Sequence, residues 1–464
     1  MEGRKKNIRR VFWLYFVLFI ALQIYLTKLI AYDSLEIRVN PHNPRLNMFD
    51  KDIKRGDIKD SGGAVLVEST AIDGGYKRIY NEPEAFSNVL GNVSHQKTGI
   101  EAKYNFVLSN LSLDIWQRAK DIMTDSGLKA DSVVLTIDSA FQSFLYNELE
   151  GYKGAVVCIE PGTGKVLAMV TRPGYNANTI AEDWEGLIAD EENSPLLNRA
   201  SSGLYPPGST FKIVSALAII RGFPEYNSYS YTCSGAETID GVTIGCYNNN
   251  AHGEVNLESA LTHSCNTYFF HMMQNKITAG QLAGAAAGLL FNEYYGYPLE
   301  YSKSSFVLND SSDTSERGQT AIGQGKTLMS PMHIALITSA VANGGIMMEP
   351  YFLGHVESYT GAAKNKTAPK KIAQVMTTEE AGILTKMMVG VVESGTGRDA
   401  KIEGLSMAGK TGTAENSTGV DHNLFTVFAP VDHPKIAVSV IVEQGADTGK
   451  ALSIAKAALG YYLK

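Results

Sequence analysis

The first 32 residues constrain the chain most, because they join a basic head to a long apolar stretch. Residues 1–10 hold five Lys or Arg side chains and one Glu, a net charge of +4, and the apolar stretch Val11–Tyr32 has no charge before Lys28. About 20 apolar residues span the roughly 30 Å hydrocarbon core of a bilayer. The stretch is long for a cleaved signal peptide, and no small-x-small cleavage site follows it. We therefore predict a cytoplasmic tail at residues 1–10 and a transmembrane signal anchor at residues 11–32.

The same charge pattern predicts where the remainder of the chain lies. Basic residues stay on the cytoplasmic side, and no second apolar stretch of this length occurs in the sequence. A single-pass membrane protein whose remaining residues lie outside the cytoplasm follows, in a compartment where ATP is not expected. The net charge of −7 argues against a nucleic-acid partner.

The four cysteines indicate neither a disulfide scaffold nor a metal site. No C-x-x-C or H-E-x-x-H pattern occurs, so the sequence predicts no metal and no cofactor. Cys233 and Cys246 lie thirteen residues apart, and outside the cytoplasm they can form a disulfide or stay as free buried thiols. Spacing alone leaves both possibilities open.

Two domains are expected after the anchor. Residues 33–130 contain the linker NPHNPR at residues 40–45, followed by short mixed segments, and predict a small membrane-proximal pedestal domain. Residues 131–464 are far more regular and predict an α/β fold with one antiparallel sheet flanked by helices. The strands expected there are 133–137, 155–159, 166–170, 424–430 and 435–443, and the helices include 139–152, 209–220 and 450–463.

A nucleophile and a base are suggested by Ser209 and Lys212 in PPGSTFK. Three residues apart at the start of an apolar helix, they share one face of its first turn. A serine needs a neighbouring base to act as a nucleophile, and a lysine in a desolvated cleft has a lowered pKa that suits this task. The S-x-x-K pattern occurs four times in this chain, so it is not specific by itself.

Two further motifs give the S-x-x-K pattern its context. Ser264 and Asn266 form the only S-x-N in the chain, and Lys410-Thr411-Gly412 precedes the C-terminal strands. Residues 404–411 also match the P-loop pattern G-x-x-x-x-G-K-T, but the Gly- and Thr-rich segment that follows is a poor helix start, so we interpret that match as coincidental.

In this order, S-x-x-K, S-x-N and K-T-G resemble the signature of penicillin-binding proteins and serine β-lactamases. The chain resembles in particular the class B penicillin-binding proteins, which are monofunctional D,D-transpeptidases, here with a short pedestal and no room for a glycosyltransferase domain. Further segments carry the resemblance: Arg55-Gly56 with Asp60, Gly63 and Leu66; Thr98-Gly99-Ile100-Glu101; and Asn198-Arg199-Ala200.

The resemblance implies a role for each motif residue. Ser209 attacks the penultimate D-Ala of a peptidoglycan stem peptide, with Lys212 as the general base. Ser264 passes the proton to the leaving amine, Asn266 holds Lys212 and the substrate amide, and Lys410 supports Ser264.

It also implies how substrate and inhibitor bind. Thr411 and Thr413 hold the terminal carboxylate, Gly412 allows the ligand backbone to approach, and the N–H groups of Ser209 and Thr413 form the oxyanion hole. A second stem peptide then accepts the acyl group, which makes the crosslink of the cell wall. β-Lactam antibiotics mimic D-Ala-D-Ala and leave a slowly hydrolysed acyl-enzyme.

The sequence leaves two alternative functions open, and the resemblance implies one partner. A D,D-carboxypeptidase or β-lactamase uses the same acyl-enzyme with water as acceptor, and a sensor or division scaffold keeps the fold without the reaction. The partner that the resemblance implies is a polytopic lipid II glycosyltransferase of the shape, elongation, division and sporulation family. The location that it implies is the bacterial cell membrane, with the catalytic domain outside the cytoplasm. Which of these cellular processes the chain serves is not determined by the sequence.

Overall fold

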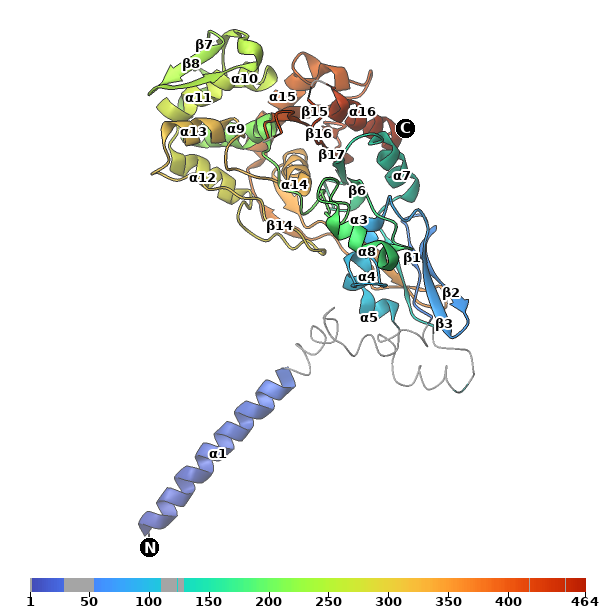
Figure 1. The fold of residues 1–464 in the computed structure, drawn as a ribbon. Coiled ribbons are helices and arrows are strands. Elements are labelled where there is room, and N and C mark those ends of the chain that lie inside the picture. Colours follow the sequence, from blue (N-terminus) through green and yellow to red (C-terminus); the bar gives the residue numbers. More distant parts are fainter. Residues whose placement is uncertain (1, 29–53, 110–122, 124–128, 417, 447) are drawn as a thin grey trace.

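The computed structural model describes residues 2–28, 54–109, 123, 129–416, 418–446 and 448–464 (Figure 1). Helix α1 (Glu2–Lys28) contains a segment, Arg9–Lys28, that is long and apolar enough to cross a membrane, and none of it is buried. This helix fits membrane anchoring. The last four residues of the predicted anchor and the linker 40–45 lie outside the described residues.

A five-stranded antiparallel sheet forms the centre of the larger part of the molecule, as predicted. Its apolar strands β5 and β17 are buried along their whole length, because helices cover both faces. Strand β15 lies at one edge. The strand order is β15 (Ala408–Ala414), β16 (His422–Ala429), β17 (Ile436–Val442), β5 (Gly154–Ile159) and β6 (Val166–Arg172).

Three helices enclose this sheet (Figure 1). Helix α14 (Pro331–Ala342) packs on β5, β16 and β17, and a hydrogen bond of 2.6 Å joins the hydroxyls of Thr338 and Thr426 in that contact. Helices α7 (Ser139–Glu148) and α16 (Lys450–Tyr462) cover the other side, which confirms two predicted helices.

A helical region adjoins the open edge of β15. Helix α15 packs against β15, and α9 and α11 carry two of the sequence motifs toward that edge. A small insert of short strands, β7 to β10, extends from this region. The elements are α9 (Lys212–Gly222), β7 (Tyr231–Cys233), β8 (Ala236–Ile239), β9 (Val242–Gly245), β10 (Gly253–Val255), α10 (Leu257–Thr262), α11 (Asn266–Asn275), α12 (Ala279–Gly288), α13 (Thr314–Ala321) and α15 (Thr378–Glu393).

A second sheet draws its strands from both sides of residue 131. The strand predicted at 133–137 forms, but it pairs in parallel with β1 and antiparallel with β12 rather than joining the central sheet. Its four residues are buried, so the backbone N–H and C=O groups at both of its edges need hydrogen-bond partners, which the two neighbouring strands supply. The order is β13 (Ala363–Lys364), β12 (Leu353–Glu357), β4 (Ser132–Leu135), β1 (Ile58–Lys59), β2 (Val65–Ile72) and β3 (Gly75–Tyr80).

The remaining described elements are short. They are α3 (Ser87–Leu90), α4 (Gly99–Lys103), α5 (Asn105–Leu108), α8 (Ile180–Ala189), β11 (Ile346–Met348) and β14 (Lys371–Gln374).

A buried carboxylate organises the pedestal. Glu101 is fully buried, and its two oxygens accept hydrogen bonds from Arg55 Nη2 at 2.8 Å and Arg78 Nε at 2.7 Å. Burial by itself disfavours the charged carboxylate, but the charges of Arg78 and Arg55 outweigh it, and the pKa of Glu101 is lowered. The segments around residues 55 and 101 are therefore joined through one ion triad.

We predict that Glu101→Gln destabilises the protein by about 3 to 5 kcal/mol, because two buried guanidinium groups lose their counter-charge. Since the folded-state pKa is lowered, this contribution is present above the ordinary carboxyl pKa and is lost as the pH falls through the folded-state value. Denaturant unfolding of both proteins near neutral pH measures the difference. The control is Glu258→Gln, whose pair with Lys386 is exposed and contributes at most about 1 kcal/mol. Equal losses in the two variants contradict the prediction.

Candidate active site

The turn that carries Ser209 is held against the edge strand. Ser209 lies in the 3-10 turn Gly208–Phe211 directly before α9, and Gly208 has a φ of +53°. A Cβ atom at Gly208 would lie 2.3 Å from the carbonyl oxygen of Thr413. Only glycine permits both this backbone conformation and this approach. The side chain of Ser209 is partly exposed, as a nucleophile must be.

Lys212 is the centre of the hydrogen-bond network. Its Nζ atom is buried and lies 3.0 Å from Ser209 Oγ, 3.1 Å from Ser264 Oγ and 2.5 Å from Asn266 Oδ1. Burial lowers its pKa from the usual 10.5 to about 7. A large fraction of this amine is therefore neutral near pH 7, with a lone pair that can accept the proton of Ser209.

The S-x-N turn places two polar side chains beside Lys212. Ser264 has a positive φ of +57°, an uncommon conformation for a non-glycine residue, and its carbonyl oxygen also accepts from Lys212 at 2.9 Å. Asn266 begins α11 and donates from Nδ2 to the carbonyl oxygen of Gly245 at 2.9 Å. With both ends of its amide engaged, Asn266 is held in a single orientation.

A second buried lysine reaches the same serine. Lys410 Nζ donates to Ser264 Oγ at 3.0 Å and to the carbonyl oxygen of Thr411 at 3.1 Å. Burial, and then the nearby charge of Lys212, lower its pKa well below the usual value. Ser264 thus lies between two lysines, where its hydroxyl can pass a proton in either direction.

The K-T-G motif lies on the open edge of the central sheet. Along β15, Lys410 and Gly412 are buried, whereas Thr411 is half-buried and Thr413 is exposed. The two threonine side chains therefore face the solvent side of the edge, where they can meet a carboxylate. Because the motif is itself a strand and the next described element is strand β16, the P-loop interpretation is excluded by the structure.

Two residues next to this edge were not predicted. Gln324 Nε2 donates to the carbonyl oxygen of Thr413 at 3.2 Å, and the hydroxyls of Thr396 and Thr411 lie 2.6 Å apart. Gln324 lies in the segment IGQGKT, whose glycines are the only sequence signal near it, and nothing in the sequence marked Thr396. The structure brings together all eight predicted site residues: Ser209, Lys212, Ser264, Asn266, Lys410, Thr411, Gly412 and Thr413.

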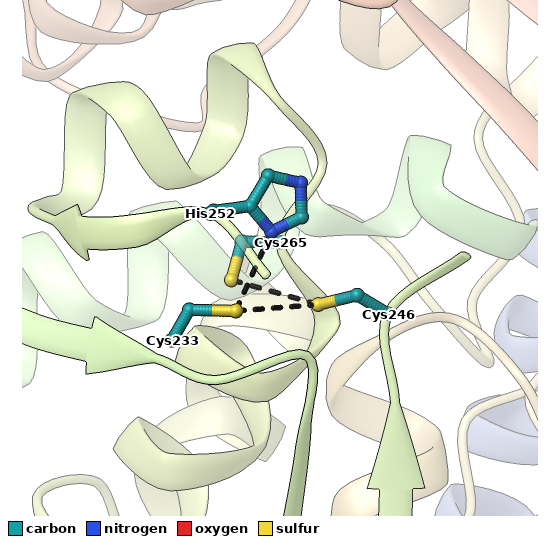
Figure 2. Close-up of side chains that lie close together, drawn as sticks. All are labelled: Cys233, Cys246, His252 and Cys265. Atoms are coloured by element: carbon teal, nitrogen blue, oxygen red, sulfur yellow. Dashed lines mark hydrogen bonds between the residues drawn. The ribbon is translucent and has the colours of Figure 1, made fainter. Parts of the chain in front are cut away.

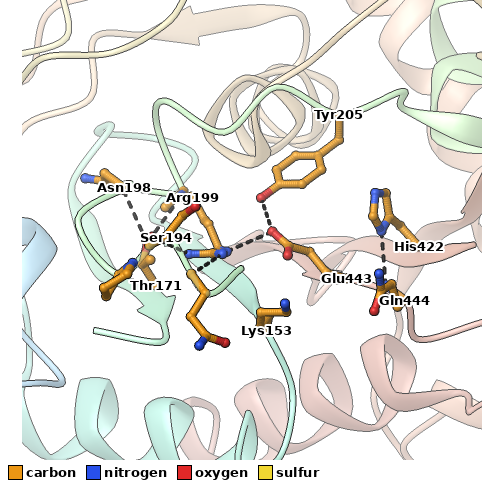
Figure 3. Close-up of polar contacts among 12 residues, drawn as sticks. Lys153, Thr171, Ser194, Asn198, Arg199, Tyr205, His422, Glu443 and Gln444 are labelled. Carbon is orange, nitrogen blue, oxygen red and sulfur yellow. Dashed lines mark hydrogen bonds and ion pairs between the residues drawn. The ribbon is translucent and has the colours of Figure 1, made fainter. Parts of the chain in front are cut away.

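A buried ion pair anchors the segment before Ser209 (Figure 3). Glu443, just after β17, accepts from Arg199 Nε at 2.8 Å and from the Tyr205 hydroxyl at 2.7 Å. Arg199 also donates to the carbonyl oxygens of Asn193 and Ser194. The loop that leads to Ser209 is thus tied to the central sheet.

Comparisons with known proteins agree with this geometry. Two family models match: the penicillin binding protein transpeptidase domain over residues 154–461, and the penicillin binding protein A dimerisation domain over residues 55–133. Neither is a glycosyltransferase. Peptidoglycan D,D-transpeptidase PbpA of Mycolicibacterium smegmatis is 31% identical over 96% of both chains, and PbpA of Mycobacterium tuberculosis is also 31% identical over 96% of both.

Solved structures show the same fold. The imipenem acyl-enzyme of penicillin-binding protein A from M. tuberculosis has a TM-score of 0.83 and 31% identity, covering 90% of this chain and 100% of that one. A D,D-transpeptidase domain from Eggerthella lenta has a TM-score of 0.79 and 30% identity, covering 88% and 99%. The chain therefore belongs to the class B penicillin-binding proteins, which are serine D,D-transpeptidases, and the resemblance drawn from its motifs is confirmed.

We predict that acylation of Ser209 by a fluorescent penicillin speeds up as the pH rises through about 7, because only neutral Lys212 can take the proton. The rate constant of adduct formation, measured across this pH range, shows the effect. The charged control Lys212→Arg should form almost no adduct at any of these pH values. A wild-type rate that does not change with pH contradicts the assignment.

Proposed function

We propose that this chain crosslinks peptidoglycan with Ser209 as nucleophile and Lys212 as general base. The observation that best supports this proposal is the hydrogen-bond network of Lys212. Its amine is buried and partly neutral, and it contacts Ser209, Ser264 and Asn266. Ser209 Oγ attacks the carbonyl carbon of the penultimate D-Ala as its proton moves to Lys212 Nζ. The tetrahedral intermediate then collapses, and the C–N bond to the terminal D-Ala breaks.

The second lysine supports proton return to the leaving amine. Ser264 Oγ lies 3.1 Å from Lys212 Nζ and 3.0 Å from Lys410 Nζ, so a proton taken by Lys212 reaches the leaving group through Ser264. Asn266 keeps the amine of Lys212 in place. In the second half-reaction, the amine of another stem peptide loses its proton by the reverse route and attacks the acyl-enzyme.

The open edge of β15 supports the assignment of the substrate site. An edge strand has unpaired N–H and C=O groups that can bind an extended peptide. We assign Thr411 and Thr413 to the terminal carboxylate, Gly412 to close approach of the ligand backbone, and the N–H groups of Ser209 and Thr413 to the oxyanion hole. The close contact between Gly208 and Thr413 supports the last assignment, because it places these two backbone segments side by side.

The proposed organisation follows the sequence boundaries: tail 1–10, anchor 11–32, pedestal 33–130 and transpeptidase domain 131–464. The basic residues before the anchor support a cytoplasmic N-terminus and an extracytoplasmic catalytic domain. A class B enzyme needs glycan strands made by another protein. We therefore propose a polytopic lipid II glycosyltransferase as partner, contacted through the anchor and pedestal.

We predict that purified wild-type protein forms a long-lived penicillin adduct on Ser209 and that Ser209→Ala forms none. Mass spectrometry of the labelled peptide locates the adduct. Ser264→Ala should still be acylated, but about 100- to 10,000-fold more slowly, since it loses proton transfer and keeps the nucleophile. An adduct that is rapidly hydrolysed indicates a β-lactamase, and wild-type protein without an adduct indicates a scaffold.

The acceptor is tested with lipid-linked glycan strands and the proposed glycosyltransferase present. Crosslinked dimers of stem peptides are expected from the wild type and not from Ser209→Ala. Release of D-Ala without dimers identifies a carboxypeptidase and contradicts the proposal.

A further inference from the structure

Three cysteines and one histidine meet beside the S-x-N turn (Figure 2). Their ligand atoms, three Sγ and the Nδ1 of His252, all lie within 4.8 Å of one another. The three cysteines are buried and the histidine is half-buried. We propose that these four side chains bind one Zn²⁺ ion that fixes the S-x-N turn of the active site. The ligands are Cys233, Cys246, His252 and Cys265.

The distances between the ligand atoms match those around a tetrahedral zinc ion. Two thiolates at about 2.3 Å from such an ion lie about 3.8 Å apart, and a thiolate and an imidazole nitrogen lie about 3.6 Å apart. The observed separations are 3.7 Å for Cys233–Cys246, 3.8 Å for Cys246–Cys265 and 3.5 Å from Cys233 Sγ to His252 Nδ1. Three soft sulfur ligands and one imidazole favour Zn²⁺ over Mg²⁺ or Ca²⁺.

The absence of a C-x-x-C pattern led to the expectation of no metal site. These ligands are instead thirteen, six and thirteen residues apart, and each lies at the end of a different element. Cys233 ends β7, and Gly253 of β10 pairs with it, so His252 lies beside Cys233. Cys246 follows β9, and Cys265 immediately precedes α11. Only the fold brings them together.

The surroundings of the cluster are suited to bound thiolates. The hydroxyl of Thr267 is buried, donates to Cys233 Sγ at 3.1 Å, and lies 3.3 Å from Cys265 Sγ and 3.7 Å from Cys246 Sγ. A polar group that bonds to ligand atoms orients them and tunes their basicity. On binding, the three thiols release their protons to solvent, and four protein ligands leave no open position. The site is therefore structural and not catalytic.

The cluster connects directly to the catalytic network. Cys265 lies between Ser264 and Asn266, which both contact Lys212. Asn266 also donates to the carbonyl oxygen of Gly245, the residue before Cys246. A metal ion here ties the insert β7–β10 to α11 and holds Ser264 and Asn266 in place. Loss of the ion is expected to shift them, and a shift of about 1 Å can slow a reaction about 100-fold.

The test measures metal content in the full-length protein, purified in detergent under reducing conditions and loaded with zinc sulfate. One zinc per chain is expected in the wild type and in Cys158→Ala, a control that removes a buried thiol of β5 outside the cluster. His252→Ala and Cys233→Ser are expected to lose the zinc. Zinc retained in both variants overturns the proposal, and so does a metal-free wild type, whether its cysteines are free or Cys233 and Cys246 form a disulfide.

Cobalt substitution gives a readout that does not need the variants to fold. Wild-type protein loaded with Co²⁺ should show thiolate-to-cobalt charge-transfer absorption and tetrahedral ligand-field bands. Their absence overturns the proposal.

Chelation of the wild type should slow penicillin acylation about 100-fold, and added zinc should restore the rate. An unchanged acylation rate in the metal-free protein overturns the role of the ion in positioning. Ser209→Ala should bind zinc normally without being acylated, which separates a failure of the zinc site from a failure of the proposed reaction.

Discussion

The active site depends on burying two lysine amines around one serine hydroxyl. The described partners of Lys212 and Lys410 are hydroxyl, amide and carbonyl oxygens, with no carboxylate among them, so burial favours the neutral amines. If both lysines were charged, their ammonium groups, which contact the same Ser264 hydroxyl, would repel each other. The chain has to exclude water here with the helical region on one side and the edge strand β15 on the other. The result is an amine, Lys212, whose pKa of about 7 suits a general base near neutral pH.

Close packing fixes the position of the helical region relative to strand β15. Gly208 brings the turn that carries Ser209 against Thr413, and the Arg199–Glu443 ion pair ties the preceding loop to the end of β17. The pedestal is joined to the same framework, because β4 and β12 complete its sheet and Asp60 accepts a 2.6 Å hydrogen bond from Ser139 at the start of α7. The pedestal is thus hydrogen-bonded to one of the helices that cover the central sheet.

Most elements of the fold could be predicted because their signals are local. The runs that became β5, β6, β16 and β17 are apolar and rich in β-branched residues, and α16 shows helical spacing. The pairing of the strands with one another was less predictable. The segment that became β4 was correctly expected to be a strand, but an apolar strand can pair with many others, and its sequence does not specify that its partners are β1 and β12.

By itself, the sequence determined which chemical groups are present and in what order: the apolar anchor, the serine, the two lysines and the asparagine of three short motifs. It also placed Arg55 and Glu101 in segments typical of the family. Only the tertiary structure decided that these two pair, that Lys212 and Lys410 share Ser264, and that three cysteines and one histidine meet beside it. The physical reason is the distance along the chain over which each effect acts. Secondary-structure propensity and hydrophobic periodicity depend on a few neighbouring residues, whereas burial and contacts between distant segments exist only after folding.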